Sequence, residues 1–203
     1  MSATAASAAG ATALAGVTVS IVSLAALHVL PTGLSPLSNA VSQYGTTRYR
    51  WGYRAAAIGQ AVAAVAIAIG LPSALHGNLS GVTGLLFAFG VTRVVIGWVP
   101  MDVPGSEATQ TGRNHGVLAA VGFLSVTFTA LRFPDVLGGG EWVWISSVSR
   151  GVGFYMLAVL VAFFALRRSP ALGRYFGLME RAFYLGMIAW LAMVGGGLVA
   201  AAN

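Results

Sequence analysis

Three long stretches of the chain carry no charged side chain, and they constrain its fold more than any other feature. With His counted as neutral, these stretches are residues 1–30, 55–92 and 182–203. Each exceeds the roughly 20 apolar residues that cross the hydrocarbon core of a bilayer. A soluble domain carries roughly 25% charged residues, whereas only 8% of this 203-residue chain is charged. The sequence therefore predicts an integral membrane protein.

Six apolar segments, separated by turn residues and arginines, predict six membrane spans. Small residues are frequent along them, and in membranes such residues let helices pack closely without a hydrophobic driving force. We predict an all-α, polytopic integral membrane protein, a bundle of six transmembrane helices that forms a single domain over residues 1–203. The spans lie at about residues 9–30, 53–75, 80–99, 114–132, 144–166 and 180–201.

All eleven basic residues are Arg, and their distribution predicts the orientation of the bundle. Eight follow the first, third and fifth spans, whereas only Arg132 and Arg150 lie toward the other side. By the positive-inside rule, the side with eight arginines faces the cytoplasm. We therefore expect a multi-pass protein of the cell membrane with both termini outside. The eight are Arg48, Arg50, Arg54, Arg113, Arg167, Arg168, Arg174 and Arg181.

The composition also narrows the chemistry. The chain has no Cys, which excludes disulfides, thiolate metal ligands and Cys nucleophiles. Its arginines are spread over three loops with no soluble module to present them, so we expect no nucleic-acid partner. Arginines beside a membrane attract anionic head groups. We expect membrane lipids as partners and leave open a homo-oligomer.

Polar residues gather where the cytoplasmic ends of the spans are expected. His28 closes the first span, His115 opens the fourth, and the loop before His115 carries Asp102. The third histidine, His76, lies at the other end, across about 30 Å of hydrocarbon. The first loop, residues 30–54, contains Pro and Gly but also apolar and aromatic residues. We expect it to fold onto the membrane face, because non-helical backbone at that depth has to be buried in protein or line a wet cavity.

Arg93 lies within the third predicted span, where a charge is costly and therefore a candidate for function. Gly97 follows it one turn later on the same helix face. We expect the Arg93 side chain to rise past Gly97 toward Asp102, because an ion pair lowers the cost of both charges. Two interpretations stay open: the ion pair only stabilises the fold, or Arg93 binds a ligand.

The two polar loops carry recognisable motifs. In order, the chain contains PTGLSPLSNAVSQYG, RYRW, VPMDVPG and TGRNHG. These motifs resemble the six-span membrane family catalogued as domain of unknown function 998. The resemblance covers essentially the whole chain by span order, and it implies an architecture but no established activity. Gln43 stands where the family pattern has Glu, Thr47 and Arg50 replace glycines, and Arg93 has no counterpart. The matching residues are Pro31, Gly33, Pro36, Leu37, Ser38, Ser42, Tyr44, Tyr49, Trp51, Pro100, Asp102, Gly112 and His115.

One functional hypothesis is an enzyme that acts on lipids at the cytoplasmic rim. In a metal-dependent hydrolase, His28, Asp102 and His115 would bind a divalent metal such as Zn²⁺ and leave one position open for water. Ser42 and Tyr44 would then position or polarise a lipid ester or amide. The residue set, though not its order, is similar to the Ser, Asp and His sites of the alkaline ceramidase superfamily of membrane hydrolases, which is an analogy only.

A second enzymatic hypothesis uses Ser42 as nucleophile, His115 as base and Asp102 as the residue that orients the base. No Gly-x-Ser-x-Gly turn surrounds Ser42, however. The alternative class is non-catalytic, a membrane scaffold or a protein that binds lipids or small molecules. An enzyme requires Asp102 and His115 side by side at a cavity, whereas a binding protein requires only the cavity and the arginines. The further candidate binding residues are Tyr44, Arg93 and Trp51.

Overall fold

The computed structural model describes residues 3–75, 78–103, 105–137, 142–167 and 173–201, so that His76 lies outside the described residues. The described part is helical and contains no strand, which confirms the predicted all-α class. Its α-helices are α1 (Ala3–Val29), α2 (Arg50–Ala74), α3 (Ser80–Ile96), α4 (Gln110–Arg132), α5 (Val143–Arg167) and α6 (Phe176–Ala200), and its short 3-10 helices are η1 (Val41–Thr46), η2 (Phe133–Val136) and η4 (Gly173–Tyr175).

The helices are those of a polytopic membrane bundle. Among the described residues, five helical segments are long and apolar enough to cross a membrane, and α3 is apolar but shorter, with 17 residues. Each predicted span corresponds to one of these helices. α4 begins at Gln110 rather than near residue 114, because the Thr109 hydroxyl accepts a hydrogen bond from the Gly112 N–H and caps the helix one turn earlier.

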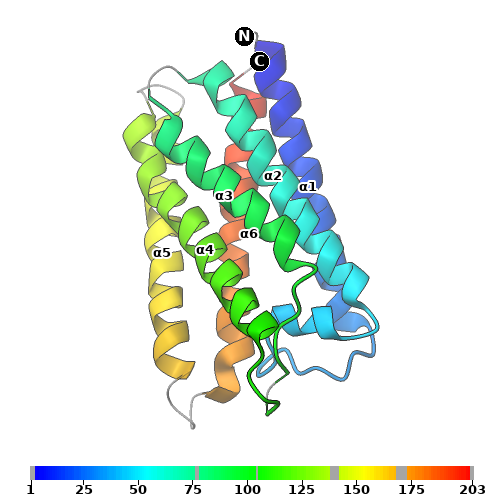
Figure 1. Ribbon diagram of the computed structural model, residues 1–203. Coiled ribbons are helices and arrows are strands. Elements are labelled where there is room, and N and C mark those ends of the chain that lie inside the picture. Colours follow the sequence, from blue (N-terminus) through cyan, green and yellow to red (C-terminus); the bar gives the residue numbers. More distant parts are fainter. Residues whose placement is uncertain (1–2, 76–77, 104, 138–141, 168–172, 202–203) are drawn as a thin grey trace.

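The core is built around α6, which contacts α1, α2, α4 and α5 and lies behind α3 and α4 in Figure 1. The Trp190 side chain of α6 is fully buried. Its indole N–H donates to the Ser149 hydroxyl at 2.7 Å, and that hydroxyl donates to the Ala130 carbonyl at 2.8 Å. The polar atoms of these two buried side chains are thereby satisfied, as a membrane interior requires.

Glycines set the distance between α1 and α2. A Cβ placed on Gly59 would come within 2.5 Å of the Gly16 carbonyl oxygen, and a Cβ on Gly16 would meet the Gly59 carbonyl oxygen at the same distance. Beside them, the Gln60 side chain donates a hydrogen bond of 2.8 Å to the Ser20 hydroxyl. The two backbones are in direct contact, in the small-residue packing that the sequence predicts.

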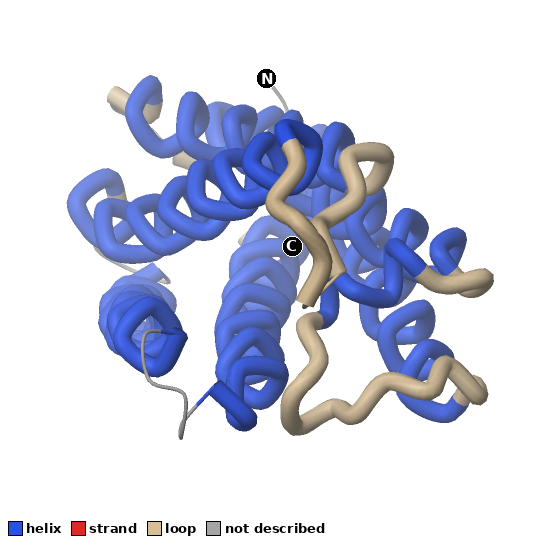
Figure 2. The backbone as a smooth tube through the Cα atoms, turned by 60° about the horizontal axis from the view of Figure 1, so that its bottom comes forward, coloured by secondary structure: helices blue, strands red, loops and turns tan. Residues whose placement is uncertain are grey.

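The two ends of the bundle differ in what they carry. The start of α1 and the end of α6 lie together at one end (Figure 1), whereas η1 and residues 30–49, 97–103 and 105–109 lie at the other. Figure 2, which brings this second end forward, shows the loops running across it. We call this end the rim. It carries His28, Ser42, Asp102 and His115, so the residues predicted to be catalytic or to bind a metal share one end of the molecule.

Candidate functional site at the rim

The first loop folds onto the bundle and is held there by the start of α6. The Glu180 side chain is only 4% exposed and accepts a hydrogen bond from the Val41 N–H at 2.6 Å. Its carboxylate therefore satisfies the start of η1, which has no capping side chain of its own. Gly177 packs directly against the backbone of Asn39, where any Cβ would overlap. Ala40, Val41 and Tyr44 are buried, as expected for backbone at that depth, whereas Leu30 and Leu37, earlier in the loop, are exposed.

Arg181, the next residue along α6, joins three elements of the rim. Its guanidinium donates to His28 Nε2 at 2.8 Å, to the Asn39 carbonyl at 2.8 Å and to the Tyr44 hydroxyl at 3.2 Å. Because His28 Nε2 accepts, the Nδ1–H must be the donor to the Leu24 carbonyl, at 2.6 Å. Both ring nitrogens of His28 are thus engaged within the protein. Tyr44, predicted to bind a ligand, is instead buried under Arg181.

Asp102 caps the start of α4. Its carboxylate accepts hydrogen bonds from the Thr109 hydroxyl at 2.6 Å and from the Thr109 N–H at 3.0 Å. These two bonds hold the pKa of the Asp102 carboxyl below its usual value. Gly112 lies against the carboxylate, and a Cβ at that position would overlap it. A carboxylate at a helix N-terminus is stabilised by the unpaired N–H groups there, so Asp102 has a structural role at this position.

Arg93 lies inside the bundle rather than reaching for Asp102, so the expected ion pair between these two residues is not formed. The Arg93 side chain is 2% exposed, and its guanidinium donates to the Tyr184 hydroxyl at 2.7 Å. The Tyr184 ring lies 5.4 Å from the Arg93 Cζ, and Glu180 acts electrostatically on the same charge. Arg93 turns inward because α6 supplies these partners, whereas Asp102 is already bonded to Thr109.

Ser42 and His115 lie at one cavity, but they are not linked by a hydrogen bond. The His115 ring is 6% exposed and donates its Nδ1–H to the Val99 carbonyl at 2.6 Å. The Ser42 hydroxyl is directed at the Met101 sulfur at 3.2 Å. The Val99 carbonyl, and not Asp102, is the hydrogen-bond partner that orients the His115 ring. The three residues proposed as a triad therefore share a region without forming a nucleophile, base and acid relay.

The predicted metal ligands are not gathered either. Among the residues that the structure describes, no group of three or more His, Asp or Glu could hold a metal ion. His28 Nε2 accepts from Arg181, so the free lone pair of its ring is used within the protein, and the Asp102 carboxylate is held by Thr109 at the start of α4. This arrangement gives no support to the hypothesis of a Zn²⁺ site at His28, Asp102 and His115.

Two cavities meet at Ser42. The larger has a volume of about 550 Å³ and lies between the rim ends of α4, α5 and α6, where α4 and α5 separate in Figure 1. We call it the rim cleft. Its polar lining consists of Ser38, Ser42, Asp102, Ser106 and Glu180, and its apolar lining includes Ala119, Ala120, Phe123, Leu124, Leu160, Phe163, Phe164 and Phe176.

The second cavity has a volume of about 390 Å³ and is bounded by η1, the start of α2 and residues 96–100. We call it the arginine pocket, because two arginines line it and none of its described lining residues is acidic. Ser42 thus separates a cavity lined by two carboxylates from one lined by two arginines. The side chains that line the arginine pocket include Ser42, Thr46, Arg50, Tyr53, Arg54 and His115.

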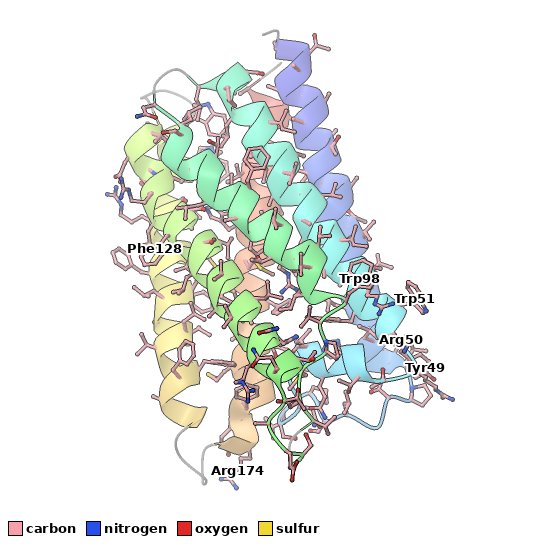
Figure 3. The ribbon with its side chains drawn as sticks, viewed as in Figure 1. Tyr49, Arg50, Trp51, Trp98, Phe128 and Arg174 are labelled. Carbon is pink, nitrogen blue, oxygen red and sulfur yellow. The ribbon has the colours of Figure 1, made fainter. Side chains whose placement is uncertain are left out.

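Arg54 is fixed at the edge of the arginine pocket. Its Nε–H donates to the Gly97 carbonyl at 2.9 Å. Its Cζ lies 4.7 Å from the Trp51 ring centroid and 5.2 Å from that of Trp98, so that two aromatic rings contact the guanidinium. Figure 3 shows Arg50, Trp51 and Trp98 on the same side of the rim. Trp51, a predicted binding residue, is 65% exposed and lies at the outer edge of this pocket.

Two residues that organise the rim were not predicted as site residues. Glu180 is in none of the predicted sites, and Arg181 is only one of the eight arginines that predict the orientation of the bundle. One signal was present, because an acidic and a basic residue stand side by side at the start of a span that is otherwise free of charge. Charges at such positions are costly and usually have partners.

Comparison with known proteins identifies a family but no function. A family model described as "Protein of unknown function (DUF998)" matches residues 14–197, which is nearly the whole chain. This match confirms the resemblance that the motifs of the two polar loops indicate. No curated protein and no solved structure matches the chain.

Proposed function

The chain belongs to the DUF998 family of proteins of unknown function, and from that premise we propose that it binds a lipid-like amphiphile in the rim cleft. The observation that carries this proposal is the division of the cleft lining. Four polar residues lie on the rim segments and Glu180 lies near the start of α6, whereas the aliphatic and aromatic wall lies along α4, α5 and α6. A ligand with a polar head and an apolar chain matches both parts.

The dimensions of the cleft fit such a ligand. Its volume of about 550 Å³ falls within the roughly 300–1,000 Å³ of small-molecule sites. From Gly116 to Leu124 the cleft follows α4, a rise of about 12 Å along the helix axis. Leu124 is 40% exposed and Phe164 is 46% exposed, so the wall continues onto the outer, lipid-facing surface. An alkyl chain can therefore enter from the bilayer.

The polar lining favours a head group that donates hydrogen bonds. Asp102 and Glu180 supply carboxylates, and the other polar residues supply hydroxyls, whereas no arginine is among the described lining residues. Carboxylates accept hydrogen bonds and attract positive charge. An amine or hydroxyl head group is therefore favoured over a phosphate in this cleft.

Binding is favoured over hydrolysis by the hydrogen bonds of the polar residues. Ser42 faces the Met101 sulfur, His115 is held by Val99, and Asp102 is held by Thr109. An activated serine has its base within hydrogen-bond reach, and these three residues lack that connection. We therefore choose the non-catalytic alternative, and release of product from a lipid ester or amide by the purified protein would reverse this choice.

Filling the cleft tests the proposal. A Cβ at Gly116, which lines the cleft, meets no atom within 4 Å, and the same is true of Gly151 on α5, which lines none of the cavities described above. We expect Gly116→Leu to weaken binding of hexadecylamine to detergent-solubilised protein by about tenfold or more, the equivalent of about 1.4 kcal/mol. Gly151→Leu should bind it like the wild type.

The head-group assignment is tested in the same experiment. Hexadecanoate has the same chain with the opposite charge, so we expect it to bind more weakly than hexadecylamine. Equal affinities for the two ligands would contradict the assigned head group. Undiminished binding by Gly116→Leu would show that the ligand lies elsewhere, and the proposed function would then be wrong.

We also propose that α3 is a sixth span and that the rim faces the cytoplasm. α3 is about 26 Å long at 1.5 Å per residue, slightly short of a hydrocarbon core of about 30 Å. The arginines described at the rim support this orientation through the positive-inside rule. A reporter enzyme active only outside the cytoplasm should be active when fused after Asn203. Activity confined to a cytoplasmic reporter at that position would invert the orientation.

A further inference from the structure

The arginine pocket holds hydrogen-bond donors without partners. The Arg50 guanidinium has no hydrogen bond or ion pair with any described residue. Arg54 uses its Nε–H on the Gly97 carbonyl and is held between two indole rings, so its terminal N–H groups are fixed in place and free to donate. A fixed guanidinium loses little freedom when it binds a second group.

A buried hydroxyl in the wall of the same pocket also lacks a partner. Tyr53 is 2% exposed, and its hydroxyl makes no hydrogen bond of ordinary geometry with the described residues, although the Arg93 side chain approaches it from inside the bundle. Leaving a buried polar group unsatisfied costs about 1–3 kcal/mol, so such groups usually have a partner, a water or a ligand. The Tyr53 ring packs against Gly45, which fixes the position of the hydroxyl.

From these donors we infer that the arginine pocket is a binding site for a phosphate group. Guanidinium groups recognise phosphate through paired, charge-assisted hydrogen bonds. With Arg50, Arg54 and Tyr53 in its lining and no carboxylate among its described residues, the pocket matches an oxyanion and not a cation. This inference does not depend on an amphiphile in the rim cleft, because the two cavities have different linings.

Phosphate can reach the pocket from two sources. Trp51 and Trp98 are half or more exposed beside Arg54 (Figure 3). Tryptophans at this level are typical of the membrane–water interface. The mouth of the pocket is therefore accessible both to a lipid phosphate in the interface and to a soluble phosphate from the aqueous side. The chemistry of recognition is the same for both.

Two binding measurements separate these sources. In the first, inorganic phosphate is titrated into protein in a non-ionic detergent and followed by calorimetry. In the second, native mass spectrometry compares retention of phosphatidic acid with that of phosphatidylcholine. Binding in the first measurement assigns a soluble anion, and selective retention of phosphatidic acid alone assigns a lipid head group. Binding in neither would overturn the inference.

Three variants locate the site. Arg50→Gln removes an exposed charge without a partner, and Tyr53→Phe removes only the hydroxyl and keeps the ring against Gly45. We expect Arg50→Gln and Tyr53→Phe each to weaken phosphate or phosphatidic acid binding by about tenfold or more, since each variant loses one hydrogen bond to a charged group. Arg174→Gln is the control, because Arg174 is also exposed but lies apart from the pocket (Figure 3).

The control variant decides between a site and a general positive surface. Unchanged binding by Arg174→Gln, together with weaker binding by the other two, supports the pocket. Equal losses in Arg50→Gln and Arg174→Gln would show only attraction to the charged rim. Full binding by Arg50→Gln and Tyr53→Phe would place the anion elsewhere, and either of these two results would contradict the inference.

Discussion

Replacing Glu180 by alanine is expected to lower the free energy of unfolding of the detergent-solubilised protein by about 1–3 kcal/mol, the cost of leaving a buried N–H without its acceptor. The carboxylate has two roles. It accepts the Val41 N–H at the start of η1, and it is the acidic residue that acts on the buried Arg93. Alanine leaves the N–H without its acceptor, and it removes a carboxylate from the surroundings of the buried guanidinium.

Conservative variants separate these two roles. Glu180→Gln keeps an acceptor for Val41 but removes the charge, so we expect it to cost less than Glu180→Ala. Arg93→Met removes the guanidinium, and the double variant Arg93→Met with Glu180→Gln leaves no uncompensated charge. The double variant should be less destabilised than the sum of its single variants by about 1 kcal/mol or more, because interacting residues are not additive.

The measurement is equilibrium unfolding in mixed micelles, followed by circular dichroism. A Glu180→Ala variant within about 0.5 kcal/mol of the wild type, the usual range for a surface change, would mean that Glu180 does not hold the first loop. Additive effects in the double variant would mean that Arg93 and Glu180 do not interact across the bundle.

The fold could be predicted because it depends on a property that is local in sequence. Charge-free runs of sufficient length specify membrane helices whatever they pack against, and each predicted span became one helix. Where a helix begins, however, depends on side-chain hydrogen bonds that the apolar pattern does not show. Thr109 and Asp102 together begin α4 earlier than the apolar pattern indicates, because their side chains satisfy the first N–H groups of the helix.

The candidate site could be predicted only in part, because its contacts join distant segments. The two polar loops do share the rim, and Ser42 and His115 do line one cavity. Which way a side chain turns, however, depends on neighbours that the sequence does not place. Arg93 was expected to rise toward the loop that follows it, and it turned inward because Tyr184, 91 positions away, faces it.

The contacts at the start of α6 join residues that are still further apart in the sequence. Glu180 bonds to the first loop across 139 positions, and Arg181 bonds to His28 across 153. No local pattern indicates that a carboxylate in the last helix caps a 3-10 helix in the first loop. Once His28 is seen as an acceptor for Arg181, its role as a metal ligand loses its basis, although residue type and position in the sequence both favoured it.

The contact between α1 and α2 leads to the other large expected effect. Gly59→Leu is expected to destabilise the protein by about 3 kcal/mol, the upper end of the cost of overpacking. Even a Cβ at this position would meet the Gly16 carbonyl oxygen at 2.5 Å and the Ser20 N at 3.0 Å, and both are backbone atoms that cannot move without moving α1. The helices would have to separate, which would also strain the hydrogen bond between Ser20 and Gln60.

Gly84→Leu is the matched control, because Gly84 is also a helical glycine and a Cβ there meets nothing within 4 Å. Leucine is a better helix former than glycine by nearly 1 kcal/mol, so Gly84→Leu should be neutral or slightly stabilising. The two variants make the same change in composition and helix propensity, and unfolding in mixed micelles therefore isolates the effect of helix contact. Equal stability of the two variants would mean that α1 and α2 do not meet at Gly59. Since α1 ends at Val29 on the rim and α2 begins at the arginine pocket, a separated pair should also weaken phosphate binding, whereas Gly84→Leu should leave it unchanged.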